Sequence, residues 1–405
     1  MEPFRDEEAS SDDPISPATH AHLQLSVRDR ISRFTWPWFA CTMSTGAIPV
    51  LIAQQPFNFY GLKTIGSIFF VLDLVLFATF TICISTRFIK HPSALGHSLH
   101  HPQESFFFGT WWVSLALILN CMQAYAVPVC GPWLVTALEV CFWMYAGCAM
   151  LVAIFQYHLI FTKESFSAGQ ALPAWILPIY PFLVLGPLAS ALVPTQPEGA
   201  ALIILIGGLL FQGLGWLFAY MIYTLYLARL ITSGLPDEST RPGMYVSVGP
   251  AAYTSATLVS LGNQAPNVIP NNFLGTPPEV ATGYFWKAFG LAAGIFVWLL
   301  GFWFFALTTL SILFGVQKMH FTLQWWAFIF PNAGLTLAAI QIGNTVGSDG
   351  VKGVTSGATI LLIIMWVFVA GMNIKAIWKK EILAPGTDVG IEDGDEQPRE
   401  EMKHD

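Results

Sequence analysis

The chain has 405 residues, of which 54% are hydrophobic and only 11% are charged, and its mean hydropathy is +0.58. Because a soluble domain carries about 25% charged residues, this composition excludes an ordinary soluble protein and indicates a polytopic membrane protein. The formal net charge of −7 comes mostly from the two ends of the chain, so it says little about a substrate, and we expect no nucleic-acid partner.

Both ends of the chain are expected to be disordered acidic tails. Residues 1–30 lack the basic stretch and the apolar core of a cleavable signal peptide. Residues 381–405 have the same polar character, with too few apolar residues to form a core. Residues 31–380 between the tails are expected to form one ten-helix membrane domain.

Between the tails, apolar runs of about 20 residues, each long enough to cross a bilayer, alternate with short polar breaks. Ten such spans follow in chain order, beginning near Arg33, Leu62, Phe106, Trp133, Leu172, Ala200, Val246, Tyr284, Thr322 and Val354. Most Lys and Arg residues fall at one set of span ends, and only Lys63, Lys287 and Lys352 fall at the other. Since cytoplasmic loops carry the excess of positive charge, both termini are predicted to be cytoplasmic.

The odd-numbered spans contain helix-breaking residues, whereas even-numbered spans lack interior proline. Proline interrupts the first span in TWPWFACTMSTGAIP, the fifth in LPAWILPIYPFLVLGP, the seventh in VSVGPAAYTSAT and the ninth in FIFPNAG, and glycine interrupts the third in FFFGTWW. A proline kinks a helix at a cost of about 3 kcal/mol, and the carbonyl groups that it frees cannot face lipid. We therefore predict an all-α fold of five helical hairpins, in which odd helices surround a central pore and even helices face lipid and neighbouring subunits.

Polar side chains on the odd spans are the predicted substrate pathway. They are hydroxyls and one amide, which can replace water around a solute: Ser44, Thr45, Thr110, Ser114, Ser190, Thr254 and Asn332. For any one of them, the alternative is the close helix packing that small polar residues provide in membranes. The pattern over the whole ring is what favours a pathway.

Phe330 is the predicted gate. It comes directly before Pro331 in the ninth span and follows a cluster of aromatic residues, WWAF. A bulky ring held beside a kink can close a narrow path both sterically and by dewetting. Ordinary aromatic packing is the alternative role for this side chain.

Three arginines at the predicted cytoplasmic ends, Arg87, Arg229 and Arg241, are candidates for attracting an anion. Such residues also extend towards lipid head groups, which is the alternative. The odd spans have no carboxylate in their middle turns, whereas a cation path would be expected to contain acidic rings. The balance of charge therefore indicates an anionic solute.

Three acidic residues lie at or within the spans. Glu104 directly precedes the third span, where a carboxylate can cap the helix and oppose its dipole, with a second role as a proton or gate element left open. Asp73 and Glu139 lie within even spans, where a charge costs at least about 2.5 kcal/mol. They are expected to make structural bonds at helix or subunit contacts, and proton coupling is the alternative.

No motif indicates an enzyme or a cofactor. The stretch HSLHH at residues 97–101 has the spacing of the histidines in membrane di-iron desaturases, but the remaining histidines form no second cluster, and a di-iron centre needs many converging ligands. The chain contains no nucleotide-binding or hydrolase motif. We expect no metal and no ATP site, so that any transport is passive or coupled to an ion gradient.

Four stretches together resemble a known family. They are TWPWFACTMSTGAIPVLI, HPQESFFFGTWWVS, RPGMYVSVGPAAYTSATLVSLG and WWAFIFPNAGLTLAAIQIG. They are similar to the fungal malate permeases, the C4-dicarboxylate branch of the tellurite-resistance/dicarboxylate transporter family, whose relatives include plant guard-cell slow anion channels and fungal sulfite pumps. The resemblance extends over about residues 30–380.

The resemblance implies a homotrimer of ten-helix protomers, each with its own pore lined by the odd helices. The family has a gating phenylalanine in the ninth helix, in the pattern W-W-x-[FY]-x-F-P, which falls on Phe330 here. It also implies transport of malate and related dicarboxylates at the plasma membrane, with proton coupling in several members. Where many members read VGPPA, this chain has Gly249, Pro250 and Ala251, which softens the kink of the seventh helix.

The function expected from the sequence is therefore transport of malate and of similar C4-dicarboxylate anions across the plasma membrane, with no enzyme activity. An anion channel or a sulfite exporter on the same scaffold is the first alternative. A sensor or scaffold with a sealed pore is an alternative of a different class.

Overall fold

The computed structural model describes residues 33–102, 104–275, 277 and 279–382, and every regular element in these ranges is a helix. The predicted tail 1–30 lies outside the described residues, and the predicted tail 381–405 lies outside them from residue 383 onwards. The all-α fold is confirmed.

The chain order of the helices is as follows. The α-helices are α3 (Phe39–Ala53), α4 (Leu62–Lys90), α5 (Pro92–Ser98), α6 (Phe108–Cys121), α7 (Val127–Cys130), α8 (Pro132–Lys163), α9 (Tyr180–Leu183), α10 (Leu185–Leu192), α11 (Glu198–Ser233), α12 (Val248–Val268), α13 (Thr282–Leu313), α14 (Phe330–Val346) and α15 (Asp349–Lys379). The 3₁₀-helices are η1 (Trp36–Trp38), η2 (Ser105–Phe107), η4 (Ala168–Gln170), η5 (Pro173–Ile179), η6 (Val193–Thr195), η7 (Glu238–Ser247), η8 (Phe273–Gly275), η9 (Val316–Lys318) and η10 (Leu323–Phe328). One π-helix, η3 (Met122–Ala126), joins α6 to α7.

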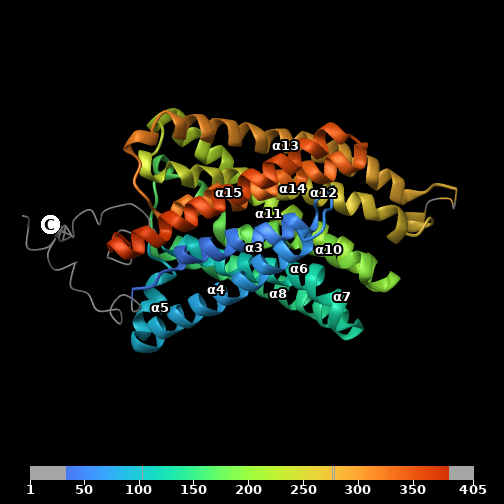
Figure 1. The fold of residues 1–405 in the computed structure, drawn as a ribbon, viewed down its shortest axis with the longest axis horizontal. Coiled ribbons are helices and arrows are strands. Elements are labelled where there is room, and N and C mark those ends of the chain that lie inside the picture. The colour runs from blue at the N-terminus through green and yellow to red at the C-terminus, as the bar shows by residue number, and fades with distance from the viewer. Residues whose placement is uncertain (1–32, 103, 276, 278, 383–405) are drawn as a thin grey trace, which may run out of the picture.

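Nine helical segments of the described chain are long and apolar enough to cross a membrane. The seventh predicted span, α12, is not among them, because its 21 residues are rich in Ser, Thr, Gly and Asn. It nevertheless packs against α11, α13 and α14, and 15 of its 21 residues are buried. A helix enclosed by other helices does not meet lipid, so it need not be apolar. The chain enters α3 and leaves α15 at the same end of the bundle (Figure 1), as an even number of crossings requires.

The helices form two concentric layers. In the inner layer, α3 contacts α6, α6 contacts α10, α10 contacts α12, α12 contacts α14, and α14 returns to α3, so the ring is closed. Each outer helix (α4, α8, α11, α13 or α15) packs against the inner helix of its own hairpin and against the next inner helix around the ring, which for α15 is α3. This arrangement confirms the five hairpins.

Burial separates the two layers. In an 18-residue apolar stretch of each inner span other than α12, between 56% and 94% of the residues are buried, whereas in the corresponding stretches of the outer spans the share is 11% to 39%. Pro49, Pro181, Pro250 and Pro331 of the inner helices are all buried. The broken helices therefore avoid the surface that would face lipid, as their freed carbonyl groups require.

The ends of the inner crossings are also regular. All five open with a 3₁₀-helix, namely η1, η2, η5, η7 and η10, before the α-helix begins. The third crossing also has an unusual far end, where the π-helix η3 follows α6. A π-helical turn is rare and commonly marks a functional position.

The contact between α6 and η5 depends on Gly109. A Cβ atom built there would collide with the backbone carbonyl of Leu177, and a backbone atom cannot rotate away. We expect Gly109→Ala to destabilise the protein by about 1–3 kcal/mol, the usual cost of overpacking. The matched control is Gly147→Ala on α8, where a new Cβ would meet nothing within 4 Å. Equal thermal unfolding midpoints of the two detergent-solubilised variants would contradict the expectation.

Candidate functional site

Phe330 lies in an aromatic seal inside the inner ring. Its fully buried ring stacks on Tyr253 of α12, with centroids 4.8 Å apart and an interplanar angle of 26°. The ring of Tyr180, from α9 in crossing five, lies 5.8 Å away on the centroids. Three of the five inner crossings therefore meet through these rings, and we call Tyr180, Tyr253 and Phe330 the aromatic seal.

Hydrogen bonds and glycines hold the seal in place. The Tyr253 hydroxyl donates to the backbone carbonyl of Phe330 (3.0 Å), and the Tyr180 hydroxyl donates to the carbonyl of Val246 (2.7 Å). A Cβ atom at Gly334 would collide with the ring of Tyr253, and one at Gly249 would collide with the hydroxyl end of Tyr180. These two glycines therefore supply the space that the tyrosines occupy.

Sequence reasoning identified Phe330 but missed both tyrosines. A signal was present, because Tyr180 precedes Pro181 just as Phe330 precedes Pro331, and Tyr253 lies three residues after Pro250. Superposing the odd spans on these prolines would have found Tyr180 beside Phe330 but not Tyr253, because Gly249 precedes Pro250.

Several predicted pathway hydroxyls link neighbouring inner crossings. The Ser44 hydroxyl donates to the carbonyl of Trp326 in η10 (2.8 Å), and Ser114 shares a 2.8 Å hydrogen bond with Thr42 of α3. The Thr110 hydroxyl donates to carbonyl groups of Phe107 (2.6 Å) and Trp36 (3.3 Å). In this structure these hydroxyls make packing contacts, and they are fully buried.

The other predicted pathway residues have varied surroundings. Thr45 accepts a hydrogen bond from Trp366 of the outer helix α15 (3.0 Å), and the Thr254 hydroxyl lies 2.8 Å from the amide of Gln212 on the outer helix α11. Asn332 donates to the carbonyl of Phe328 (2.9 Å), while its own Oδ1 is buried without a partner among the described residues. Of the seven predicted residues, Asn332 is the one with an unused buried polar atom.

Amide side chains link the inner crossings at the end of the bundle opposite the termini. The Gln341 amide donates to Gln54 (3.2 Å), which joins α14 to α3, and Gln264 of α12 donates to the carbonyl of Ser190 on α10 (2.8 Å). Two further amides make similar links, since Asn263 donates to Thr345 (2.6 Å) and Asn120 donates to the carbonyl of Pro187 (3.4 Å). We call these five side chains the amide collar: Gln54, Asn120, Asn263, Gln264 and Gln341. Sequence reasoning missed most of the collar, although amides recur near the ends of four odd spans.

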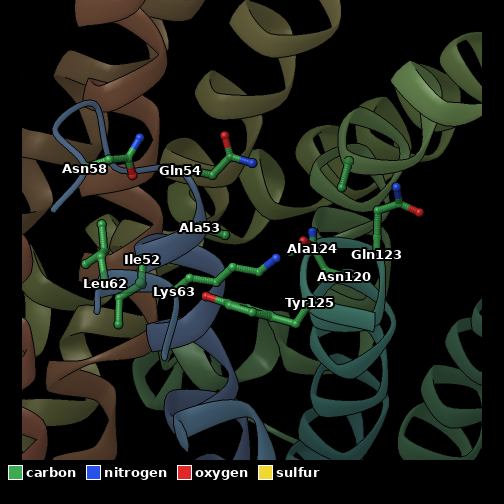
Figure 2. A pocket seen from close by; sticks show the side chains of 11 residues that line it. Ile52, Ala53, Gln54, Asn58, Leu62, Lys63, Asn120, Gln123, Ala124 and Tyr125 are labelled. Carbon is green, nitrogen blue, oxygen red and sulfur yellow. The ribbon is translucent and has the colours of Figure 1, made fainter. Parts of the chain in front are cut away.

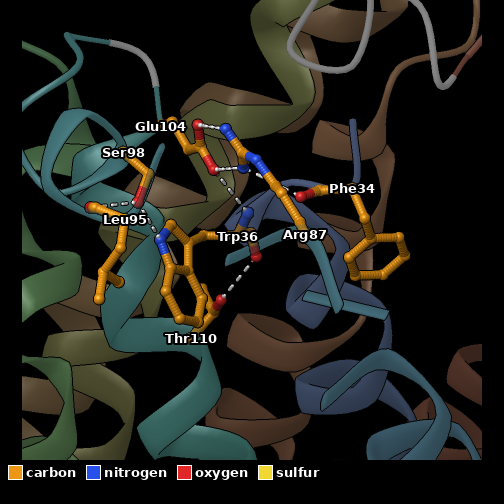
Figure 3. A network of polar contacts seen from close by, with 7 residues as sticks. All are labelled: Phe34, Trp36, Arg87, Leu95, Ser98, Glu104 and Thr110. Carbon is orange, nitrogen blue, oxygen red and sulfur yellow. Dashed lines mark hydrogen bonds and ion pairs between the residues drawn. The ribbon is translucent and has the colours of Figure 1, made fainter. Parts of the chain in front are cut away.

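The opposite end contains a buried ion pair (Figure 3). Arg87 and Glu104 approach to 2.5 and 3.2 Å in a bidentate pair. Arg87 also donates to the carbonyl of Phe34 (2.9 Å), and Glu104 accepts from the backbone N–H of Trp36 (3.4 Å). The helix cap predicted for Glu104 is wrong, because its side chain makes no capping bond. The pair instead fastens the start of crossing one to the end of α4 and the start of crossing three.

The other two predicted arginines also bind backbone carbonyl groups. Arg241 donates to Pro236 (3.0 Å) and to Ser311 (3.1 Å), and it lies 3.5 Å from the carboxylate of Glu238. A backbone hydrogen bond, followed by the nearby charges of Arg241 and Lys318, holds the pKa of Glu238 below its ordinary value. The Arg229 side chain donates to the carbonyl of Gly234 just after α11 (3.1 Å).

Asp73 is completely buried on the outer helix α4. Neither of its carboxylate oxygens has a hydrogen-bond partner in the described part of the chain, so the structural bond expected from the sequence is not found. The side chain faces Gly46 of α3, where a Cβ atom would come within 2.7 Å of Oδ2. Glu139, the other acidic residue predicted within an even span, is only half-buried on α8.

The histidine cluster that follows α4 makes ordinary contacts. His97 lies 5.3 Å from His100 and 5.4 Å from His101 on the ring centroids, and His100 Nδ1 is 3.1 Å from Glu164. Within the described ranges, no group of three or more metal-binding side chains is found.

Comparison with known proteins places these features in a family. The family model described as SLAC1, voltage-dependent anion channel, matches residues 33–374. The malic acid transport protein of Schizosaccharomyces pombe is 33% identical over 91% of this chain and 83% of its own length, and a putative malic acid transport protein of the same yeast is 31% identical over 91% and 85%. The sulfite efflux pump SSU1 of Arthroderma benhamiae is 28% identical over 87% and 93%. The fold is a closed ring of five broken helices, and one family model matches nearly the whole of it. This chain belongs to the SLAC1 family.

Proposed function

We propose that the protein transports C4-dicarboxylates, malate first among them, through the interior of the inner ring, and that Phe330 is the gate. The closed ring of inner helices, inside which the rings of Tyr180, Tyr253 and Phe330 meet, is the observation that carries the proposal. The similarity to two malic acid transport proteins over 91% of the chain supports the choice of solute. Because a sulfite efflux pump is also similar, an anion channel or sulfite exporter is the second candidate.

The chemistry of the gate suits an anion. α14 begins at Phe330, so the positive end of its dipole lies at the seal, and helix N-termini favour negative charge. An anion that leaves water must regain hydrogen bonds, since burying an unpaired charge is prohibitive. In the proposal, Ser44, Thr110 and Ser114 exchange some packing bonds for bonds to the solute once Phe330 moves, and Asn332 lies next to that path.

The proposal also covers the location of the protein, its orientation in the membrane and its oligomeric state. We place the protein in the plasma membrane, as the resemblance to the malate permeases implies. Both termini and both tails are placed in the cytoplasm, because most Lys and Arg residues lie at the end of the bundle where α3 begins. We also propose a homotrimer, in which large exposed apolar side chains of the outer helices, such as Phe296 on α13 and Leu210 on α11, meet lipid or a neighbouring copy. Arg229 has no ion-pair partner among the described residues, so of the three arginines it is the best placed to attract an anion.

Uptake of labelled malate by proteoliposomes containing the purified chain tests the function. We expect uptake above that of empty vesicles, inhibition by unlabelled malate and succinate, and weak inhibition by sulfite. Strong competition by sulfite with none by succinate would replace the dicarboxylate proposal with the sulfite exporter. Absence of any flux, even for a variant with an opened gate, would favour a sealed sensor or scaffold.

We propose that transport is coupled to protons and that Asp73 is the group that binds the proton. A carboxyl group buried without a partner is stable only when neutral, because desolvating an unpaired charge costs far more. We expect Asp73→Asn, which imitates the neutral acid, to abolish the stimulation of malate uptake by an acidic exterior while malate exchange continues.

The matched control is Glu139→Gln on α8, which removes a half-buried carboxylate from another outer helix. It is expected to leave the stimulation by a pH gradient unchanged. Equal stimulation of the wild type and of Asp73→Asn would remove Asp73 from the coupling.

A further inference from the structure

A pocket of about 390 Å³ opens at the end of the bundle opposite the termini, next to the amide collar (Figure 2). This volume falls in the range of about 300–1,000 Å³ that is usual for small-molecule sites. Its wall comes from the end of α3, the loop after it, the first turn of α4, the end of α6 with the π-helix η3, and α10. The pocket therefore lies where two inner crossings end and one outer helix begins.

Lys63 is the only charged residue that lines this pocket, and no acidic residue lines it among the described residues. Figure 2 shows its side chain extending from the start of α4 across the pocket towards α6 and η3. No ion pair of Lys63 is found within the described ranges. An ammonium group has three donors, so an unpaired one at the rim of a polar pocket attracts an anion.

Lys63 places a positive charge at the end of a helix where the helix dipole favours a negative one. α4 has 29 residues and begins after Gly61, and no side chain caps it. A cation in the first turn is unfavourable, because the N-terminus of a helix already carries partial positive charge. The uncapped N-terminus and the lysine would both be compensated by the same bound anion.

Neutral donors and a rigid wall complete the pocket. Gln54 accepts at its amide oxygen from Gln341, so its NH₂ group is the end left to donate to a solute, and Asn58 adds a second amide. Gln123 is more than nine-tenths buried in the wall, and its Oε1 has no partner in the described part of the chain. Tyr125 is fixed by a 2.7 Å hydrogen bond to the carbonyl of Pro49. Because an amide oxygen only accepts, the unpartnered Oε1 of Gln123 can bind a water or a hydroxyl group of the solute, but not a carboxylate.

We propose that this pocket is a capture site for the dicarboxylate, in which Lys63 and the start of α4 bind one carboxylate and the amides of Gln54 and Asn58 bind the other. The inference rests on the proposed transport of dicarboxylates and adds the place where the solute binds before it reaches the aromatic seal. Two separated polar regions, one cationic and one neutral, fit an anion with a carboxylate at each end. A small inorganic anion would contact only the region around Lys63.

The test uses the purified full chain in proteoliposomes and follows initial rates of malate uptake. We expect Lys63→Gln to raise KM for malate about tenfold, as loss of a hydrogen bond to a charged group does, with kcat within about twofold. Lys63→Arg should restore most of the affinity, and Gln54→Leu should raise KM by a smaller factor. The control is Lys287→Gln, which removes a positive charge from α13, outside the pocket.

A second measurement separates capture from a general effect of charge. The inhibition constant of succinate should rise with the KM of malate in both Lys63→Gln and Gln54→Leu, while that of a monocarboxylate such as lactate should rise in Lys63→Gln and stay unchanged in Gln54→Leu. An unchanged KM in Lys63→Gln, or an equal rise in Lys287→Gln, would overturn the capture site and leave the transport proposal intact. If the wild type takes up no malate, the transport proposal itself fails, which is a distinguishable result.

Discussion

Replacing Phe330 with alanine is expected to raise the leak of small anions through the protein at least tenfold. The ring lies between Tyr180 and Tyr253 and is fully buried, so removing it leaves a gap inside the inner ring. A factor of ten requires the barrier to fall by only about 1.4 kcal/mol. The gap also removes an apolar surface that excludes water from the path. Anion currents or vesicle efflux at a fixed membrane potential measure the change.

The matched control for this variant is Phe304→Ala. Phe304 is as deeply buried, but it packs on Tyr223 between the two outer helices α13 and α11, with centroids 4.7 Å apart. The same volume is therefore deleted outside the aromatic seal, and both variants should lose comparable stability, about 3–5 kcal/mol. If the two leaks are equal, the leak reports loosened packing, and Phe330 is not the gate.

Truncating either partner of the Arg87–Glu104 pair is expected to have the largest effect on stability. Only 13% and 9% of the two side chains is exposed, and removing one buried charge leaves the other unpaired, which costs about 3–5 kcal/mol. Arg87→Ala also leaves the carbonyl of Phe34 without its donor, and Glu104→Ala removes the acceptor of the Trp36 N–H. Thermal unfolding of the protein in detergent measures both losses.

Two comparisons give this prediction its control. Asp349→Ala breaks the pair of Asp349 with Lys352, in which 87% of the aspartate side chain is exposed, and such surface pairs contribute about 0–1 kcal/mol. Replacing both Arg87 and Glu104 with apolar residues should cost less than the sum of the single changes, because no buried charge is left unpaired. Additive losses in the double variant would show that the two side chains act independently.

The layered architecture was predictable because it follows from a local property. A proline inside a helix removes a backbone hydrogen bond and kinks the helix. The bilayer tolerates carbonyl groups freed in this way only where protein surrounds them. Pro49, Pro181, Pro250 and Pro331 therefore carried enough information to assign their helices to the inner layer. The seventh crossing shows the same logic, since its polar composition lowers its hydropathy but suits a helix that other helices enclose.

The partners of individual side chains were not predictable in the same way. The sequence placed Glu104 before a helix and suggested a cap, but the end of α4 brings Arg87 to that place. It offered Asp73 as one of two acids in even spans, and only the packing of α4 on α3 shows that the Asp73 carboxyl group has no partner in the described chain. The role of a polar group depends on what faces it, and the facing residue is usually distant along the chain.

By itself, the sequence determined that the protein lies in a membrane, that its crossings alternate between broken and continuous helices, and that Phe330 lies beside a kink. Only the tertiary structure decided that Tyr180 and Tyr253 flank this ring, that amides link the inner crossings at one end, and that Lys63 extends across a pocket to which the described residues contribute no acidic side chain. The transfer of apolar residues into lipid and the kinking of a helix by proline depend only on residues close together in the sequence, so both can be predicted from the sequence. A seal, a collar and a pocket need side chains from several helices at once, and those meet only when the ring closes.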